Sequence, residues 1–261
     1  MSETHHPCLC CGYRTFAYPT GGSMDMCPVC GWEDIYGLAD CEGAREFALA
    51  DHQRLYLTTG IGNENFHGEV RPPLPEEARS IHWASFDELR LRVIQDIETA
   101  FHDVRRDGGV TLHQLDLVDG PCVPDPVELK EAARKDPEQA WQDIPAEKLS
   151  RFAESLSLFF LDDPGVLFHL PAFMRHALTS SHPAINEAGI ESLLGFLAGG
   201  PDYHVWKNAF ARFSSEQNSA TASFVFLIAT YGDGFQAARA IKGLRKGWQS
   251  FVPDFLKLAI L

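Results

Sequence analysis

The sequence lacks any hydrophobic run long enough to cross a membrane. Its N-terminus also lacks the basic region leading into an apolar stretch that marks a secretory signal peptide. Three common catalytic motifs are missing as well, because the chain contains no G-x-S-x-G, no P-loop and no H-E-x-x-H. From these absences we expect a cytoplasmic protein that is not an enzyme and does not bind membranes.

Basic residues are also scarce, and the net charge is −14. Residues 1–75 contain 10 acidic and 4 basic residues, residues 76–145 contain 16 and 8, and residues 146–261 contain 10 and 10. The excess negative charge therefore belongs to the first 145 residues. Such a field repels nucleic acid and attracts basic partners. A contribution to solubility alone is the alternative interpretation.

Four of the seven cysteines form two C-x-x-C pairs, Cys8/Cys11 and Cys27/Cys30. Fifteen residues separate Cys11 from Cys27, a spacing typical of a structural zinc site. A glycine follows each pair and permits a tight turn with both sulfurs on one side. Four thiolates complete a tetrahedral coordination sphere and leave no position for a catalytic water. We predict a structural Zn²⁺ ion bound by Cys8, Cys11, Cys27 and Cys30.

Other interpretations of the cysteines stay open. One or two disulfides would suit an exported protein, and an iron–sulfur or rubredoxin-type iron site would use the same ligands. A reducing cytoplasm favours metal over disulfide. Cys10 lies between the ligands and is expected to point away from the metal, with an exchange of Cys10 for Cys11 as the alternative. Cys41 and Cys122 are expected to be small, partly buried residues.

The pattern along the chain predicts an α+β protein that is mostly α-helical. Residues 1–72 are expected to form a small zinc-ribbon domain with a following helix over residues 40–57. Residues 80–261 are expected to form a multi-helix domain. The proline-rich segment 71–75 reads as an extended linker between the two domains.

Three of the predicted helices begin with a capping box, in which a Ser or Thr is followed three residues later by Glu or Gln. The pattern occurs at Ser85/Glu88, Thr111/Gln114 and Ser214/Gln217. Further helices are expected over residues 127–136, 149–160, 171–179, 190–198, 205–212 and 235–248. The run 162–165, Asp-Asp-Pro-Gly, is predicted to be a turn.

One more cluster of titratable residues, Asp162, Asp163, His169 and His176, lies in this region. The two histidines are seven residues apart and would share a face of a continuous helix, but Pro171 between them should interrupt it. We expect histidines that form hydrogen bonds within the fold. A second metal site, or a hydrolase pocket around His169, is the alternative.

The two cysteine turns read Cys8-Leu9-Cys10-Cys11-Gly12-Tyr13 and Cys27-Pro28-Val29-Cys30-Gly31-Trp32-Glu33-Asp34. This pair of motifs resembles the bacterial cysteine-rich CPCC family, which opens with a CPCCGY-like turn and continues with CPVCxWED. Leu9 replaces the usual proline, and this difference from the family motif changes none of the predicted ligands. The resemblance implies a zinc-ribbon-like domain of the kind found in polymorphic toxin systems.

A second series of motifs follows downstream: Trp141-x-Asp143-Ile144-Pro145, Phe168-x-Leu170-Pro171-Ala172-Phe173 and Phe213-Ser214-x-Glu216-Gln217. The series is similar to an uncharacterised helical domain family of bacterial proteins that looks like an accessory of toxin–immunity loci. The resemblance spans most of residues 90–248. Its motifs are mainly core and capping residues, so they indicate a fold rather than a chemistry.

We therefore predict a cytoplasmic binding protein of the immunity or antitoxin type, which inhibits a basic bacterial toxin by occlusion. The alternative is a zinc-ribbon accessory factor in transcription or nucleic-acid metabolism, which would require a basic or aromatic face. Arg14 is the only Lys or Arg between His6 and Trp32, so nucleic-acid binding is not expected. The acidic residues predicted to contact the partner are Glu33, Asp34, Asp40, Glu42, Asp103, Asp116, Asp119 and Asp125.

Overall fold

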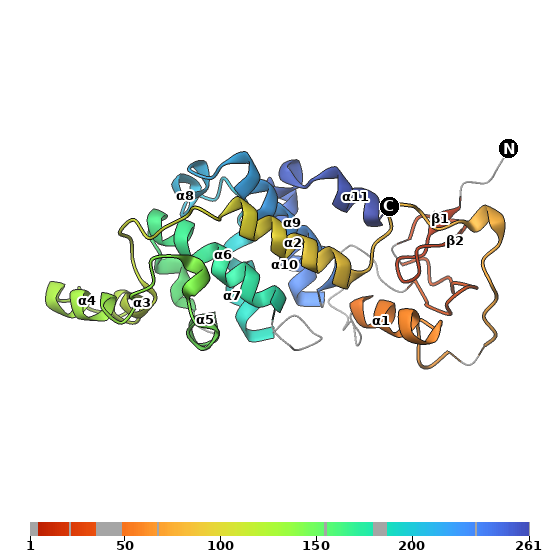
Figure 1. Ribbon diagram of the computed structural model, residues 1–261, viewed down its shortest axis with the longest axis horizontal. Helices are drawn as coiled ribbons and strands as arrows, with labels where there is room; N and C mark the ends of the chain where they lie inside the picture. Colours follow the sequence, from red (N-terminus) through yellow and green to blue (C-terminus); the bar gives the residue numbers. More distant parts are fainter. Residues whose placement is uncertain are drawn as a thin grey trace. The chain divides into compact units, whose positions relative to one another are not determined.

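Figure 1 shows the computed structural model, which describes residues 5–20, 22–34, 49–66, 68–153, 156–179, 187–232 and 234–260. The described residues are mostly helical, with a small antiparallel sheet near the N-terminus. This confirms the predicted class, α+β and mostly α. The chain packs into two compact units. The first comprises Met1–Arg92, Phe226–Ala238 and Val252–Leu261, and the second comprises Val93–Val225 and Arg239–Phe251.

The first unit contains the sheet and helix α1 (Leu49–Thr59). Strand β1 (His6–Pro7) pairs antiparallel with β2 (Arg14–Phe16), so the two strands flank the first cysteine turn. Helix α1 packs against this turn, because its Gln53 side chain donates a hydrogen bond to the Leu9 carbonyl at 2.8 Å. The helix predicted after the ribbon is present over residues 49–59, and its expected start at 40–48 lies outside the described residues.

The proline-rich segment is extended, as predicted, but it is fastened to the second cysteine turn. The Arg71 backbone N–H donates to the Pro28 carbonyl at 2.9 Å. The Arg71 guanidinium also forms an ion pair with Glu77 at 2.5 Å. Glu77 ends the short 3-10 helix η1 (Pro75–Glu77), and its buried carboxylate accepts a hydrogen bond from the Leu74 N–H at 2.8 Å. The segment therefore packs as part of the first unit.

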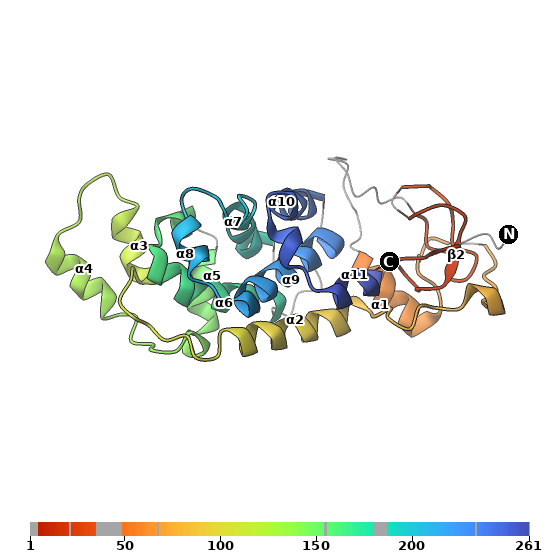
Figure 2. The same ribbon diagram turned by 90° about the horizontal axis from the view of Figure 1, so that it is seen from above.

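The rest of the chain is a succession of helices, which Figures 1 and 2 show from two directions. Their bounds are α2 (Phe86–Ala100), α3 (Leu112–Val118), α4 (Pro126–Ala133), η2 (Trp141–Asp143), α5 (Ala146–Ala153), η3 (Leu156–Phe160), α6 (Asp163–Thr179), α7 (Glu187–Leu197), α8 (Lys207–Ala211), α9 (Ser215–Tyr231), α10 (Gly234–Arg245), η4 (Trp248–Phe251) and α11 (Asp254–Ile260). No helix in the described part of the chain is both long enough and apolar enough to span a membrane.

Aromatic residues form much of the core of the second unit. The Phe196 and Trp206 rings are stacked with centroids 3.7 Å apart. Two of the buried indoles donate their N–H groups to backbone oxygens: Trp141 donates to Phe101 at 2.8 Å, and Trp248 donates to Leu197 at 3.0 Å. These large rings bury much apolar area, which stabilises the packing of the second unit.

The three predicted capping boxes are present. At the start of α2, the Ser85 N–H donates to the Glu88 carboxylate at 2.8 Å. The Thr111 N–H donates to the Gln114 side chain at 2.8 Å, and the Ser214 N–H donates to the Gln217 side chain at 3.0 Å. Each box satisfies N–H groups that have no partner within the helix.

Three predictions about the region from residue 149 to 179 were wrong. The apolar helix predicted over 149–160 is α5, which ends at Ala153, followed by the separate 3-10 helix η3. Helix α6 begins at Asp163 and continues through Pro171. The expected turn at 162–165 is instead the helix start, because the Asp162 carboxylate accepts the Gly165 N–H at 3.0 Å and thereby caps α6. The remaining helix hydrogen bonds and deep burial hold α6 together across the proline.

Candidate metal centre

The two cysteine turns have the same backbone geometry. In the first, the Gly12 N–H donates to the Cys8 carbonyl at 2.7 Å and the Cys8 N–H donates to the Tyr13 carbonyl at 2.8 Å. In the second, the Gly31 N–H donates to the Cys27 carbonyl at 2.8 Å, and the Cys27 N–H donates to the Trp32 carbonyl at 2.8 Å. The repeated sequence C-x-x-C-G-aromatic therefore produces a repeated turn that brings two sulfurs to one side.

Each turn depends on its glycine for two reasons. Gly12 and Gly31 have φ angles of +79° and +70°, which side chains rarely adopt. An aromatic ring also covers each glycine: a Cβ at Gly12 would lie 2.5 Å from Trp83, and a Cβ at Gly31 would lie 2.5 Å from Phe66. The rings of Trp83 and Phe66 therefore close over the backbone of the two turns.

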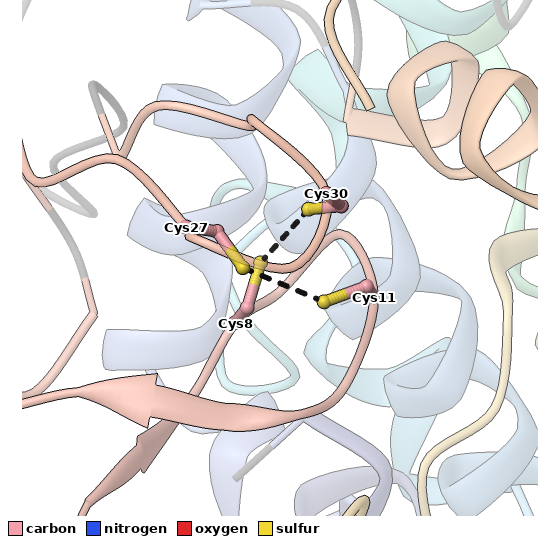
Figure 3. Close-up of side chains that lie close together, drawn as sticks. All are labelled: Cys8, Cys11, Cys27 and Cys30. Atoms are coloured by element: carbon pink, nitrogen blue, oxygen red, sulfur yellow. Dashed lines mark hydrogen bonds between the residues drawn. The ribbon is translucent and has the colours of Figure 1, made fainter. Parts of the chain in front are cut away.

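Figure 3 shows the four sulfur atoms facing one another between the turns. The Sγ atoms of Cys8 and Cys30 are 3.8 Å apart, those of Cys11 and Cys27 are 3.7 Å apart, and all four lie within 4.8 Å of one another. A tetrahedral ion with metal–sulfur bonds of about 2.3 Å has sulfur–sulfur edges of about 3.8 Å. All four cysteines are free and buried. The cluster therefore fits a metal tetrathiolate and contains no disulfide.

The electrostatics of the cluster also favour a cation. Burial raises the pKa of the Cys8 thiol, because a thiolate at this position has lost its water. Hydrogen bonds from the Cys11 and Cys30 thiols lower the pKa of Cys27, and the Thr15 hydroxyl lies 3.3 Å from its sulfur. Four thiolates at these distances would repel one another strongly. A divalent ion at their centre would offset that repulsion and the cost of burial.

Cys10 is buried beside the cluster but is not part of it. Its thiol donates to the His52 carbonyl, with the sulfur 3.4 Å from the oxygen. A Cβ at Gly62 would lie 2.6 Å from the same sulfur, so the chain needs glycine there. The geometry thus favours Cys11 over Cys10 as the fourth ligand. Cys122 is exposed, so its predicted partial burial was wrong, and Cys41 lies outside the described residues.

The predicted acidic contacts near the ribbon are not all available to a partner. Asp34 is fully buried, and its carboxylate accepts the backbone N–H groups of Gly22 at 3.2 Å and Ser23 at 3.1 Å. This carboxylate holds the loop between the cysteine turns, so Asp34 is removed from the set of surface contacts. Glu33 is half-buried. Asp40 and Glu42 lie outside the described residues.

The four acidic contacts predicted in the helical region are all exposed. Asp116, Asp119 and Asp125 lie on one hairpin formed by α3 and α4. Asp116 pairs with Arg151 at 2.7 Å, and Asp125 caps α4 by accepting the Val127 N–H at 2.7 Å. Asp103 lies after the end of α2, beside His102 at 2.8 Å. The structure therefore brings three of the four together on one element.

The histidine cluster has a structural explanation. His169 is buried, and its Nδ1–H donates to the Gly165 carbonyl at 2.8 Å, one turn earlier in α6. Burial lowers the pKa of His169 to about 4, because the charged imidazole would be poorly solvated. His176 lies on the same continuous helix, with its Nε2 3.1 Å from the Ser150 hydroxyl. These contacts agree with the expectation of histidines bonded within the fold.

A buried carboxylate, Asp136, was missed by the sequence reasoning. It accepts hydrogen bonds from the His113 N–H and ring, both at 2.8 Å, and from Lys148 at 2.9 Å. Burial alone would raise the pKa of this carboxyl, but the hydrogen bonds from His113 and Lys148 outweigh it and lower the pKa to about 2. Asp136 ends a run of charged residues, and such a run indicates a solvated surface, so the sequence holds no signal for its burial.

Two known family models match the chain, one after the other. Residues 6–77 match the Cysteine-rich CPCC family, which confirms the resemblance drawn from the two cysteine turns. No curated protein and no solved structure matches the chain. Residues 90–252 match a second family model, and this match covers more than half of the 261 residues. The chain therefore belongs to the family of unknown function DUF6714, and it carries a CPCC domain ahead of the segment that defines the family.

Proposed function

We propose that this chain is a non-enzymatic binding protein of the immunity or antitoxin type, which acts in the cytoplasm and occludes a basic bacterial toxin. The observation that carries the proposal is the charge of −14, all of it in the first 145 residues, together with the exposure of Asp103, Asp119 and Asp125. Acidic side chains on a fixed surface accelerate association with a basic cleft and discriminate against other partners. Inhibition would then require only that the bound chain cover the cleft.

We further propose that the ion held by Cys8, Cys11, Cys27 and Cys30 is zinc and that its role is structural. Zinc accepts four thiolates without redox chemistry and suits a closed tetrahedral site. A tetrathiolate iron site would have similar sulfur–sulfur distances, so the identity of the ion has to be measured. Elemental analysis of protein purified without added metal should give one zinc per chain. Iron with the visible absorption of a ferric tetrathiolate would contradict the assignment.

The function itself is tested by affinity capture of the tagged chain from its native cells. We expect a basic protein in stoichiometric amount that is released by high salt. When expressed alone, that protein should be toxic to cells, and co-expression of this chain should restore growth. Recovery of polymerase or ribosome components instead would favour the zinc-ribbon accessory factor.

A charge-reversal series gives the matched control. The triple variant Asp103→Lys, Asp119→Lys and Asp125→Lys should weaken capture and flatten its salt dependence. The control is Asp202→Lys, an exposed acidic residue in the part of the chain with balanced charge. Equal capture by the triple variant and the control would overturn the proposed mode of binding.

A further inference from the structure

The hairpin of residues 112–133, named here the arm, is clamped at its base by Asp136. The Asp136 carboxylate accepts hydrogen bonds from the His113 ring at the start of α3, at 2.8 Å, and from the Lys148 ammonium on α5, at 2.9 Å. The Arg106 guanidinium donates to the backbone carbonyl of Asp136, and Lys148 also pairs with Glu138 at 2.7 Å. Because Asp136 is almost fully buried, these contacts fix both ends of the arm to the second unit.

The arm is also ordered along its length. The Gln114 side chain joins α3 to α4 by donating to the Leu129 carbonyl at 3.0 Å. Arg151 on α5 holds Asp116 at 2.7 Å. In both views of the molecule, α4 lies beside α3 at one end of the second unit (Figures 1 and 2). The turn between the helices is thus presented on a fixed support.

Residues 119–128, named here the tip, span the turn between α3 and α4 and the first residues of α4. The sequence Asp-Gly-Pro-Cys-Val-Pro-Asp-Pro-Val-Glu contains three acidic residues, three prolines and no Lys or Arg. Val123 is 96% exposed and Val127 is 64% exposed. Prolines restrict the unfolded and unbound conformations of such a turn. The tip therefore exposes the side chains of Val123 and Val127 to water, and acidic residues flank them in the sequence.

This combination matches the central requirement of a protein–protein contact. A few side chains buried at the centre of an interface supply most of the binding energy, while charged residues at the rim set the orientation and the rate of association. Preorganisation lowers the entropy lost on binding. The carboxylates of Asp119 and Glu128 specify a partner that carries Lys or Arg around an apolar depression, and they exclude a nucleic-acid backbone.

We propose that the tip is the element that enters the basic protein partner, with Val123 and Val127 in an apolar depression and with Asp119 and Glu128 on its basic rim. This inference rests on the proposed function and assigns its binding surface. It involves no chemistry at the tip, and it does not use the metal centre.

The first test is a contact experiment in native cells. A benzophenone amino acid in place of Val123 should give one photo-crosslinked product after irradiation. The control position is Val205, which is also in the second unit and 45% exposed, and it should give none. Equal crosslinking at both positions, or at neither, would overturn the inference.

The second test measures affinity, with the basic protein recovered by wild-type capture as the probe. Val123→Asp should raise the Kd at least tenfold, whereas Val205→Asp should leave it unchanged. Since Val123 contacts almost only water in the free chain, both variants should keep the wild-type circular dichroism spectrum. Unchanged affinity of Val123→Asp would refute the tip as the contact and leave the proposed function intact. Failure of the wild-type chain to retain any salt-released basic protein would overturn both.

Discussion

The side-chain oxygen of Gln53 accepts a hydrogen bond from the backbone N–H of Phe86 at 2.6 Å, inside the first unit. This N–H lies in the first turn of α2 and has no partner within the helix. The side-chain nitrogen of Gln53 donates to the Leu9 carbonyl at 2.8 Å, in the first cysteine turn, and lies 3.4 Å from the Tyr231 hydroxyl. One buried side chain therefore connects the metal-binding turn to the start of α2 and the end of α9.

Replacing this residue, as Gln53→Ala, should destabilise the first unit by about 2–4 kcal/mol, because it leaves the buried Phe86 N–H and the partly buried Leu9 carbonyl without the Gln53 side chain as a partner. It should also release the metal at a lower denaturant concentration than wild type. Urea unfolding with a colorimetric zinc indicator measures both effects. Gln95→Ala, at an exposed position of α2, is the control. Metal release that does not differ between the two variants would show that Gln53 does not support the cysteine turn.

The ligand set makes a separate prediction about neighbouring cysteines. Cys11→Ser should remove the bound metal, because a hydroxyl is a poor substitute for a thiolate on zinc. Cys10→Ser should retain one metal per chain, since its sulfur bonds to the His52 carbonyl. Elemental analysis of both purified variants gives the answer. The opposite result, with metal lost in Cys10→Ser and kept in Cys11→Ser, would exchange the two cysteines in the ligand set.

The glycine of the second turn should tolerate no side chain. Gly31→Ala combines a φ angle of +70° with a Cβ that meets Phe66 at 2.5 Å. Gly60 has a similar φ angle, +81°, but a Cβ there meets nothing within 4 Å. Gly60→Ala should therefore cost about 1 kcal/mol from backbone strain alone, and Gly31→Ala about 2–4 kcal/mol. Phe66→Ala combined with Gly31→Ala should recover part of the difference in thermal unfolding. Equal losses for the two glycine variants would mean that the Phe66 contact is unimportant.

Much of the local structure was predictable because it depends on short-range chemistry. The spacing of Cys8, Cys11, Cys27 and Cys30 identified the cluster, since the two turns that bring them together are built from adjacent residues. The capping boxes at Ser85, Thr111 and Ser214 marked three helix starts for the same reason. These features depend on residues within a few positions of one another.

The predictions that were wrong concern residues whose environment is set by distant parts of the chain. Asp34 and Asp136 look like surface carboxylates in the sequence, yet each is buried because donors from another segment surround it. Helix α6 continues through Pro171 because its packing outweighs the missing hydrogen bond. Asp116, Asp119 and Asp125 lie together on the arm because α3 and α4 pack side by side. The composition of the sequence does not reveal this grouping.

The buried imidazole of His169 predicts how stability depends on pH. Its pKa is about 4 in the folded chain and about 6.5 when unfolded. Between these values the unfolded chain binds a proton that the folded chain does not, so stability is lost as the pH falls from 6.5 to 4. The shift corresponds to about 3 kcal/mol. His169→Asn, which cannot be protonated, should have a smaller loss of stability than wild type between pH 7 and pH 4.5.

The comparison must separate this effect from acid release of the metal, which protonates the thiolates in every variant. Urea unfolding at both pH values is therefore measured for wild type, His169→Asn and His82→Asn, the last at an exposed histidine. His82→Asn should follow wild type, because the side chain of His82 is exposed. If all three lose the same stability between pH 7 and pH 4.5, the metal centre and not His169 governs the acid sensitivity of the fold.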